Sequence, residues 1–415
     1  MSTLSGRDGT EGLHAAATSP TTPTTARPRH PSAGLALRRS RLSNFLGYID
    51  AVSCGRRRNH SRQTRRRPAG SVTLRKSPHR AIVGVGFDLQ EEDPVVSNAH
   101  SLEAVTPALS IQPVNFAAED PGPGGWRWLI EQARAADEAG IDRLVVSDHV
   151  VFGENLEEYG RPEVGGTKGG QQPTGPDGHW LEPITTLSVI AGATKHIRLL
   201  TGILIAALRR PVVLAKSTAT LDVLSEGRLD LGVGVGWQRE EYEAAGLKFE
   251  GRGYTLDQSL DVCQKIWRET TVNYQSDDLS FEKIHCMPKP LQPGGVPIWV
   301  SGRLNKRVFE RIARFGSGWI PWGDDARDPI GGLTRIREVL EAAGRDASGF
   351  QVGTYLQNVK GDGGIDLERT MENVAGMAEA GITDFRAQLP IPDDYNAAVD
   401  YLSNVVQVFR KAAGR

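Results

Sequence analysis

Eight strand-like segments alternate with eight helix-like segments between about residues 106 and 412. The strand-like segments are short apolar runs, whereas the helix-like ones place apolar residues three or four positions apart. Strict alternation of this kind is typical of parallel sheets in which each helix crosses back over the sheet. Eight units favour closure into a (β/α)8 TIM barrel, which takes about 250 residues plus insertions. A doubly wound open sheet has the same alternation and stays an alternative.

Local signals set the expected boundaries. The predicted strands are Ala108–Val114, Ile141–Ser147, Ile197–Ile205, Leu229–Val235, Pro297–Val300, Gly318–Pro321, Phe350–Leu356 and Ile382–Leu389. The predicted helices are Trp126–Ala139, Ile184–Ala193, Pro211–Leu224, Thr255–Trp267, Lys306–Phe315, Thr334–Ala343, Leu367–Ala380 and Asn396–Ala412. Gly140 suits the end of the first helix, and Pro211 suits the first turn of the third. Thr255 and Gln258 predict a capping box that opens the fourth helix.

Two connections exceed the usual short loop. Val150–Leu181, rich in Gly and Pro, follows the second strand. Because loops after barrel strands carry the active site, this insertion is a candidate lid or substrate loop. Thr270–Gly295 follows the fourth helix and lies on the opposite face. Within it, Val272–Tyr274 and Leu279–Ile284 flank a polar turn, which predicts a hairpin.

The net charge of −1 is an average over two unlike parts. Residues 1–80 carry 16 basic and 3 acidic side chains, and residues 81–415 carry 33 basic and 47 acidic ones. The basic part is rich in Ser, Thr and Pro, so residues 1–104 are predicted to be a disordered extension of the domain 105–415. Three alternatives stay open for this extension: a nucleic-acid-binding arm, a targeting peptide, or a start codon assigned upstream of the true one.

Composition excludes several classes of protein. With 39% hydrophobic and 24% charged residues, the chain is neither disordered throughout nor a coiled coil. No apolar run approaches the ~18 residues of a membrane span, so no membrane association is expected. Cys54, Cys263 and Cys286 form no CxxC pair, which suits buried thiols in the cytoplasm.

Three motifs occur in a fixed order. Val146-Ser147-Asp148-His149 ends the second strand, and the block from Ala215 to Trp237 runs from the third helix through a glycine-rich strand. Pro297–Gly302 then precedes a helix and Gly316–Trp319. This set resembles the bacterial luciferase-like monooxygenase superfamily and is most similar to its coenzyme F-420-dependent branch. The resemblance covers about residues 106–410 and none of the basic extension.

The resemblance implies a two-electron oxidoreductase. Hydride would pass between coenzyme F-420, a deazaflavin, and a small organic substrate at the carboxyl-terminal mouth of the barrel. An FMN-dependent monooxygenase that consumes oxygen and a catalytically silent flavin-binding protein are the alternatives. We also expect a homodimer whose barrel binds no nucleic acid.

Asp148 and His149 are the predicted catalytic residues. They follow a strand at the end where barrel enzymes place their chemistry. An imidazole can take or give the proton that accompanies hydride transfer near neutral pH. A histidine that only hydrogen-bonds the neighbouring loop is the alternative.

Gly234, Gly236 and Trp237 are predicted cofactor-binding residues. Together with Gly232, the glycines alternate along one strand, so one face of that strand is bare and a flat ring or phosphate could approach the backbone. Trp237 and Arg239 stand where a dinucleotide fingerprint needs glycine, which excludes a nicotinamide-type motif. Small residues that serve core packing are the alternative.

Two further segments complete the predicted cofactor site. Gly202 and Ile203 lie where the resembling family has a bulge with a non-prolyl cis peptide against the flavin. Ser301, Gly302 and Arg303 precede a helix, where a hydroxyl, backbone N–H groups and a guanidinium suit a phosphate. A solvated surface position is the alternative for Arg303.

Two negative observations limit the function. His149, His179 and His196 show no metal-ligand spacing, so no metal site is predicted. The sugar-phosphate dehydrogenases of the resembling family place a Glu where this chain has Trp237 and an aromatic residue where it has Gly153. These departures argue against sugar-phosphate oxidation and leave the substrate open.

Overall fold

The computed structural model describes residues 106–415. Eight parallel strands close into a barrel, and their order around the barrel is their order along the chain. The strands are β1 (Ala108–Ile111), β3 (Arg143–Val146), β5 (Arg198–Thr201), β6 (Leu229–Val233), β9 (Ile298–Gly302), β10 (Gly316–Pro321), β11 (Gln351–Tyr355) and β14 (Asp384–Ala387). Because β14 pairs with β1, the sheet has no open edge, which confirms the barrel and excludes the doubly wound alternative.

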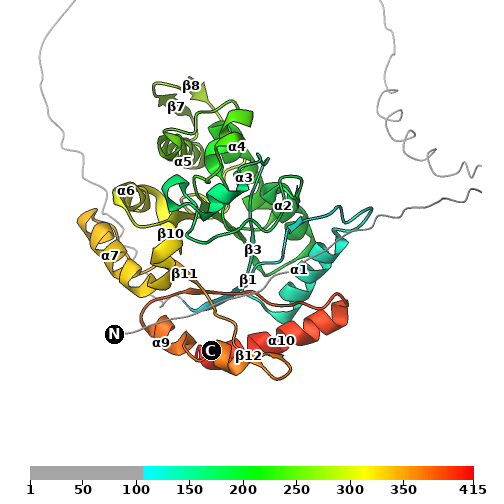
Figure 1. Cartoon of the computed structure of the whole chain (residues 1–415). Helices are drawn as coiled ribbons and strands as arrows, with labels where there is room; N and C mark the ends of the chain where they lie inside the picture. The colour runs from blue at the N-terminus through cyan, green and yellow to red at the C-terminus, as the bar shows by residue number, and fades with distance from the viewer. Residues whose placement is uncertain (1–105) are drawn as a thin grey trace, which may run out of the picture. The chain divides into compact units, whose positions relative to one another are not determined.

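Helices surround this barrel. They are α1 (Arg127–Ala139), α2 (Pro183–Ala193), α3 (Pro211–Leu224), α4 (Arg239–Ala244), α5 (Arg252–Arg268), α6 (Lys306–Phe315), α7 (Pro329–Ala342), α8 (Leu367–Thr370), α9 (Val374–Glu379) and α10 (Tyr395–Ala412). The last helix lies beside the first, as the red and cyan ribbons of Figure 1 show. The ring of helices therefore closes where the barrel closes.

Three expected helix boundaries were wrong. Helix α5 begins at Arg252, and the predicted capping-box side chain of Gln258 instead donates to Ser276 Oγ over 2.7 Å. Helix α7 begins five residues before its predicted start because the Asp328 carboxylate caps its first turn. The predicted helix Leu367–Ala380 is two short helices, α8 and α9.

Both predicted insertions are present. The first, after β3, contains two 3-10 turns, η1 (Leu156–Gly160) and η2 (Pro162–Val164), and ends in the short strand β4 (His179–Trp180). In the second, the antiparallel strands β7 (Val272–Gln275) and β8 (Ser280–Ile284) form the expected hairpin next to α5 (Figure 1).

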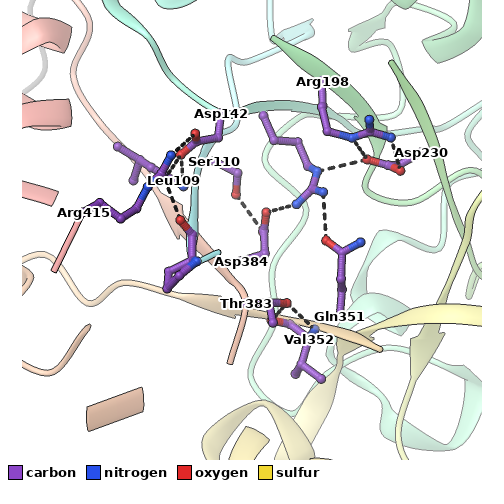
Figure 2. Close-up of polar contacts among 12 residues, drawn as sticks. Leu109, Ser110, Asp142, Arg198, Asp230, Gln351, Val352, Thr383, Asp384 and Arg415 are labelled. Carbon is purple, nitrogen blue, oxygen red and sulfur yellow. Dashed lines mark hydrogen bonds and ion pairs between the residues drawn. The ribbon is translucent and has the colours of Figure 1, made fainter. Parts of the chain in front are cut away.

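A paired charge network fills the amino-terminal end of the barrel interior. Arg143 forms ion pairs with Asp230 and Asp384, and its third nitrogen donates to Gln351 Oε1 over 3.2 Å. Arg198 also binds Asp230, as Figure 2 shows. Burial acts to lower the pKa of Arg143, but Asp384 and Asp230 outweigh it and raise that pKa. Every charge in this layer is therefore compensated.

An apolar layer lies above the charges. Val145, Leu200, Trp299 and Ile320 form it and are buried. Because alternate residues of a barrel strand face inward, the next inward positions lie at the carboxyl-terminal mouth. That mouth is where the site residues gather.

The remaining expectations concern cysteines and membranes. Cys263 and Cys286 are buried as predicted, and burial raises the pKa of the Cys263 thiol. Cys54 and the extension 1–104 lie outside the described residues, so their assignments stay predictions. No helix of residues 106–415 combines the length and hydrophobicity that crossing a membrane requires.

Candidate active site

Asp148 and His149 follow β3 but face different partners. The buried Asp148 carboxylate accepts the backbone N–H of Ile205 over 2.8 Å and binds the Arg209 guanidinium through both oxygens. Burial acts to lower the pKa of Arg209, but Asp148 and Glu182 outweigh it and raise that pKa. Asp148 thus fixes the segment after β5, and both of its carboxylate oxygens are engaged in doing so.

His149 lies in an aromatic cage. Its ring centroid is 4.4 Å from that of Phe152, 4.8 Å from Trp180 and 5.9 Å from Trp237. The side chain is only 9% exposed. Its Nε2 atom lies 3.1 Å from the amide nitrogen of Gln172 in the first insertion. Because an amide nitrogen only donates, this contact places the proton of a neutral ring on Nδ1.

Glu241, in α4, faces that Nδ1 atom. Its Oε2 lies 3.2 Å from His149 Nδ1, within ion-pair distance, although the ring N–H is not aligned for a hydrogen bond. Its other oxygen accepts the backbone N–H of Val150 over 2.9 Å, and the residue is 1% exposed. Glu241 was not predicted from the sequence. An acidic residue four positions after Trp237 was the available signal.

The alternating glycines, of which Gly232 lies in β6 and Gly234 and Gly236 follow it, accommodate the neighbouring chain. A Cβ at Gly232 would lie 1.9 Å from the carbonyl oxygen of Thr201, and one at Gly234 would lie 2.8 Å from Ile203 Cδ1. Gly236, with a φ of 64°, meets the same segment two residues later. These distances give the packing alternative a concrete cause: the chain after β5 occupies the face that the glycines leave bare. A cofactor contact at Gly234 and Gly236 stays a prediction.

The bulge after β5 enters the barrel mouth. The peptide bond between Gly202 and Ile203 is cis, at the position that the resemblance implied. A Cβ at Gly202 would lie 2.4 Å from Val145 Cγ1 and 3.2 Å from Arg386 Nη1. The bulge is therefore packed between the apolar layer and a barrel-interior arginine.

The predicted phosphate donors have partners within the protein. The Ser301 hydroxyl donates to the Ile320 carbonyl over 3.1 Å, and the Gly302 carbonyl accepts from an indole N–H of the next strand. Arg303 donates to the first insertion. The side chain of Asn305 caps the first N–H groups of α6. A phosphate would have to replace the contacts of Ser301, Arg303 and Asn305, whereas the Gly302 carbonyl is an acceptor and would not bind it.

The first insertion is held over the mouth through its backbone. Three side chains of the barrel domain donate to its carbonyl groups: Arg303 to Pro162, Arg252 to Val164 and Trp322 to Gly165. In addition, the Tyr159 ring lies 5.5 Å from that of Trp237. The insertion therefore covers His149 from solvent.

Comparison with known proteins identifies the family. The family model described as luciferase-like monooxygenase matches residues 108–374. This chain belongs to the luciferase-like monooxygenase family. An uncharacterized protein of Mycobacterium tuberculosis is 30% identical over 227 residues, which are 54% of this chain and 75% of the relative. The F-420-dependent glucose-6-phosphate dehydrogenase of Segniliparus rotundus is 30% identical over 235 residues, covering 54% of this chain and 62% of that enzyme.

A solved structure confirms the family fold. An F-420-dependent secondary alcohol dehydrogenase in complex with an F-420–acetone adduct superposes with a TM-score of 0.54. It is 17% identical, and the match covers 74% of this chain and 99% of that one. The characterised relatives named here are oxidoreductases, and both use the deazaflavin.

The mouth of this luciferase-like barrel suits a flat aromatic cofactor. Phe152, Trp180 and Trp237 place apolar rings around His149 at this end of the barrel. The buried indole N–H of Trp237 has no hydrogen-bond partner among residues 106–415. A buried donor of this kind costs free energy unless a ligand accepts its hydrogen bond. The residues present therefore fit a ring that carries polar atoms at its edge.

Proposed function

We propose that this chain is an oxidoreductase that transfers hydride between coenzyme F-420 and a small organic substrate in the barrel mouth. The observation that carries the proposal is the pairing of His149 with Glu241 inside an aromatic cage beside the Gly202–Ile203 bulge. When bound, the coenzyme supplies the hydride chemistry, and the protein supplies position and electrostatics. The dependence of the named relatives on F-420 supports the choice of cofactor.

His149 would hold or move the proton at Nε2. Glu241 faces the other ring nitrogen, Nδ1. In this structure the side chain of Gln172, from the first insertion, contacts Nε2. Glu241 fixes the ring orientation from the other side, because its own position is set by the Val150 N–H. Asp148 would act as a positioning residue that holds the chain after the bulge. Opening of the insertion would admit the ligands, and closure would exclude water from the transfer.

Titration with both candidate cofactors tests the proposal. The purified full chain is titrated separately with coenzyme F-420 and with FMN while protein and cofactor fluorescence are recorded. We expect saturable binding of F-420 that is at least about tenfold tighter than that of FMN. Tight binding of FMN alone would refute the deazaflavin assignment and support the monooxygenase alternative.

A His149 variant separates an enzyme from a silent cofactor-binding protein. His149→Gln is expected to bind F-420 as the wild type does, while turnover falls about 100-fold or more. The matched control is His196→Gln, because His196 is exposed in the turn between α2 and β5. Turnover unchanged by His149→Gln would exclude the proposed proton role.

A further inference from the structure

Arg386 is a second buried arginine inside the barrel, one inward position closer to the mouth along β14 than Asp384, the partner of Arg143. It is 3% exposed and lies in β14, two residues after Asp384. Its Nη1 donates to the Tyr355 hydroxyl over 3.1 Å, but its Nε has no partner among the described residues. No carboxylate of residues 106–415 lies within ion-pair distance of it. Unlike Arg143, this cation has no anionic partner among the described residues.

Burying an unpaired charge costs free energy, and Tyr355 offsets only part of that cost. Its ring centroid lies 5.1 Å from the guanidinium carbon, a cation–π contact, and strands β11 and β14 pair Tyr355 directly with Arg386. The Tyr355 hydroxyl in turn donates to Gln112 Oε1 over 3.4 Å. A tyrosine is neutral, so within residues 106–415 the positive charge remains without an anion. Because Tyr355 is 38% exposed, the pair can be reached from solvent.

A small cavity adjoins the two side chains. Its volume is about 20 Å³, and its lining residues are Ile320, Pro321, Ala326, Gly353, Thr354, Tyr355 and Arg386. A cavity of this size holds about one water molecule, and hence one oxygen atom of a ligand. The guanidinium also faces the bulge, since a Cβ at Gly202 would lie 3.2 Å from Nη1. The uncompensated charge thus stands between this cavity and the predicted cofactor position.

We propose that Arg386 and Tyr355 form a carboxylate-binding subsite, and that the substrate carries a carboxylate with one oxygen in this cavity. A guanidinium binds a carboxylate through charge-assisted hydrogen bonds, and the free Nε–H is an available donor. A carboxylate carries one negative charge and so matches the single cation, whereas a phosphate carries about −1.5 to −2 charges at pH 7 and would leave excess negative charge at a buried site. This proposal rests on the proposed function in one respect: it takes the carboxyl-terminal mouth of the barrel as the place where the substrate binds.

Anion-dependent thermal unfolding of the full chain tests the subsite without turnover. Sodium acetate, sodium phosphate and sodium chloride are compared at equal ionic strength in the wild type, Arg386→Met, Tyr355→Phe and Arg143→Met. We expect acetate to raise the wild-type Tm saturably above the chloride value, and phosphate not to do so. Arg386→Met should abolish the acetate effect, and Tyr355→Phe should weaken acetate affinity several-fold.

The two arginine variants separate a ligand site from a structural role. Without acetate, Arg386→Met should unfold at or above the wild-type Tm, because it removes an uncompensated buried charge. Arg143→Met should unfold well below it, because Asp230 and Asp384 lose their partner. An absent acetate effect in the wild type, or one retained in both Arg386→Met and Tyr355→Phe, overturns the proposal. A Tm of Arg386→Met as low as that of Arg143→Met also overturns it. F-420 binding is measured in a separate experiment. That experiment tests the proposed function, so the two proposals can fail independently.

Discussion

The residues around His149 do not stand at the sequence positions where the sugar-phosphate dehydrogenases carry the corresponding side chains. The sequence lacks the aromatic residue at Gly153 and the Glu at Trp237 that the sugar-phosphate dehydrogenases carry. In space, Phe152 lies 4.4 Å from the His149 ring, and Glu241 lies 3.2 Å from it. An aromatic ring and a carboxylate are therefore both present. The two departures no longer argue against sugar-phosphate oxidation, and the substrate must be decided by the rest of the mouth.

Replacing the carboxylate that faces His149 should slow turnover more than it weakens binding. Glu241→Gln keeps an oxygen for the Val150 N–H but removes the charge opposite Nδ1. We expect kcat to fall about 100-fold while KM and F-420 affinity change little. Glu240→Gln is the matched control. It removes a neighbouring carboxylate that contacts Asn155 of the insertion, whereas the carboxylate facing His149 is that of Glu241. Equal losses in both variants, or a loss confined to KM, would contradict the assigned role of Glu241.

Between elements, one carboxylate joins α1 to the turn before β5. Asp137 accepts the backbone N–H groups of Lys195, His196 and Ile197 over 2.7, 2.8 and 2.7 Å. Burial acts to raise the pKa of Asp137, but the three donors outweigh it and hold that pKa below its usual value. Because the pKa is lowered in the folded state, the stabilisation is present above about pH 4 and is lost as the pH falls further.

A neutral replacement of Asp137 should therefore destabilise the protein in a pH-dependent way. Asp137→Asn is expected to lower the free energy of unfolding by about 1–3 kcal/mol at pH 7. The difference from the wild type should shrink below pH 4, where the wild-type carboxyl also becomes protonated. Urea unfolding at pH 7 and pH 3 measures this, with the exposed Asp400→Asn as control. A difference that is the same at both pH values would show that charge is not the cause.

The elements were more predictable than the site they carry. All eight barrel strands and the bounds of α3 and α6 followed from apolar periodicity with Pro and Gly signals, because burial and backbone geometry act locally. The start of α5 failed because Gln258 has a tertiary partner instead of a cap. Glu241 and Arg386 were missed for a related reason. Their roles depend on partners far away in the sequence, and neither belongs to a motif.

At the scale of the whole molecule, the barrel is closed by its own two ends. Strands β1 and β14 pair along four residues. Arg415 donates to the Pro107 carbonyl over 2.6 Å and binds both oxygens of Asp142 (Figure 2). These contacts join Arg415 to the residues that directly precede β1 and β3. Among the described residues, the contacts that close the barrel begin at Pro107.

Removal of the basic extension should accordingly leave the enzyme intact. A chain lacking residues 1–104 is expected to keep the Tm, the F-420 affinity and the turnover of the full chain. Removal of residues 1–112 also deletes β1, so this longer truncation should abolish cooperative unfolding. Salt-dependent retention on DNA, measured with the same proteins, tests the extension. Retention unchanged by the first truncation would exclude a nucleic-acid role for residues 1–104.

The way in which the first insertion is fastened has a consequence for how this protein can evolve. The three fastening donors belong to the barrel domain, and their acceptors are main-chain oxygens of Pro162, Val164 and Gly165. Main-chain oxygens persist when side chains change. Mutations between Leu156 and Gln172 can therefore change the side chains of this insertion while it stays fastened over the mouth. New specificities could arise in this segment without any change in the barrel that holds it.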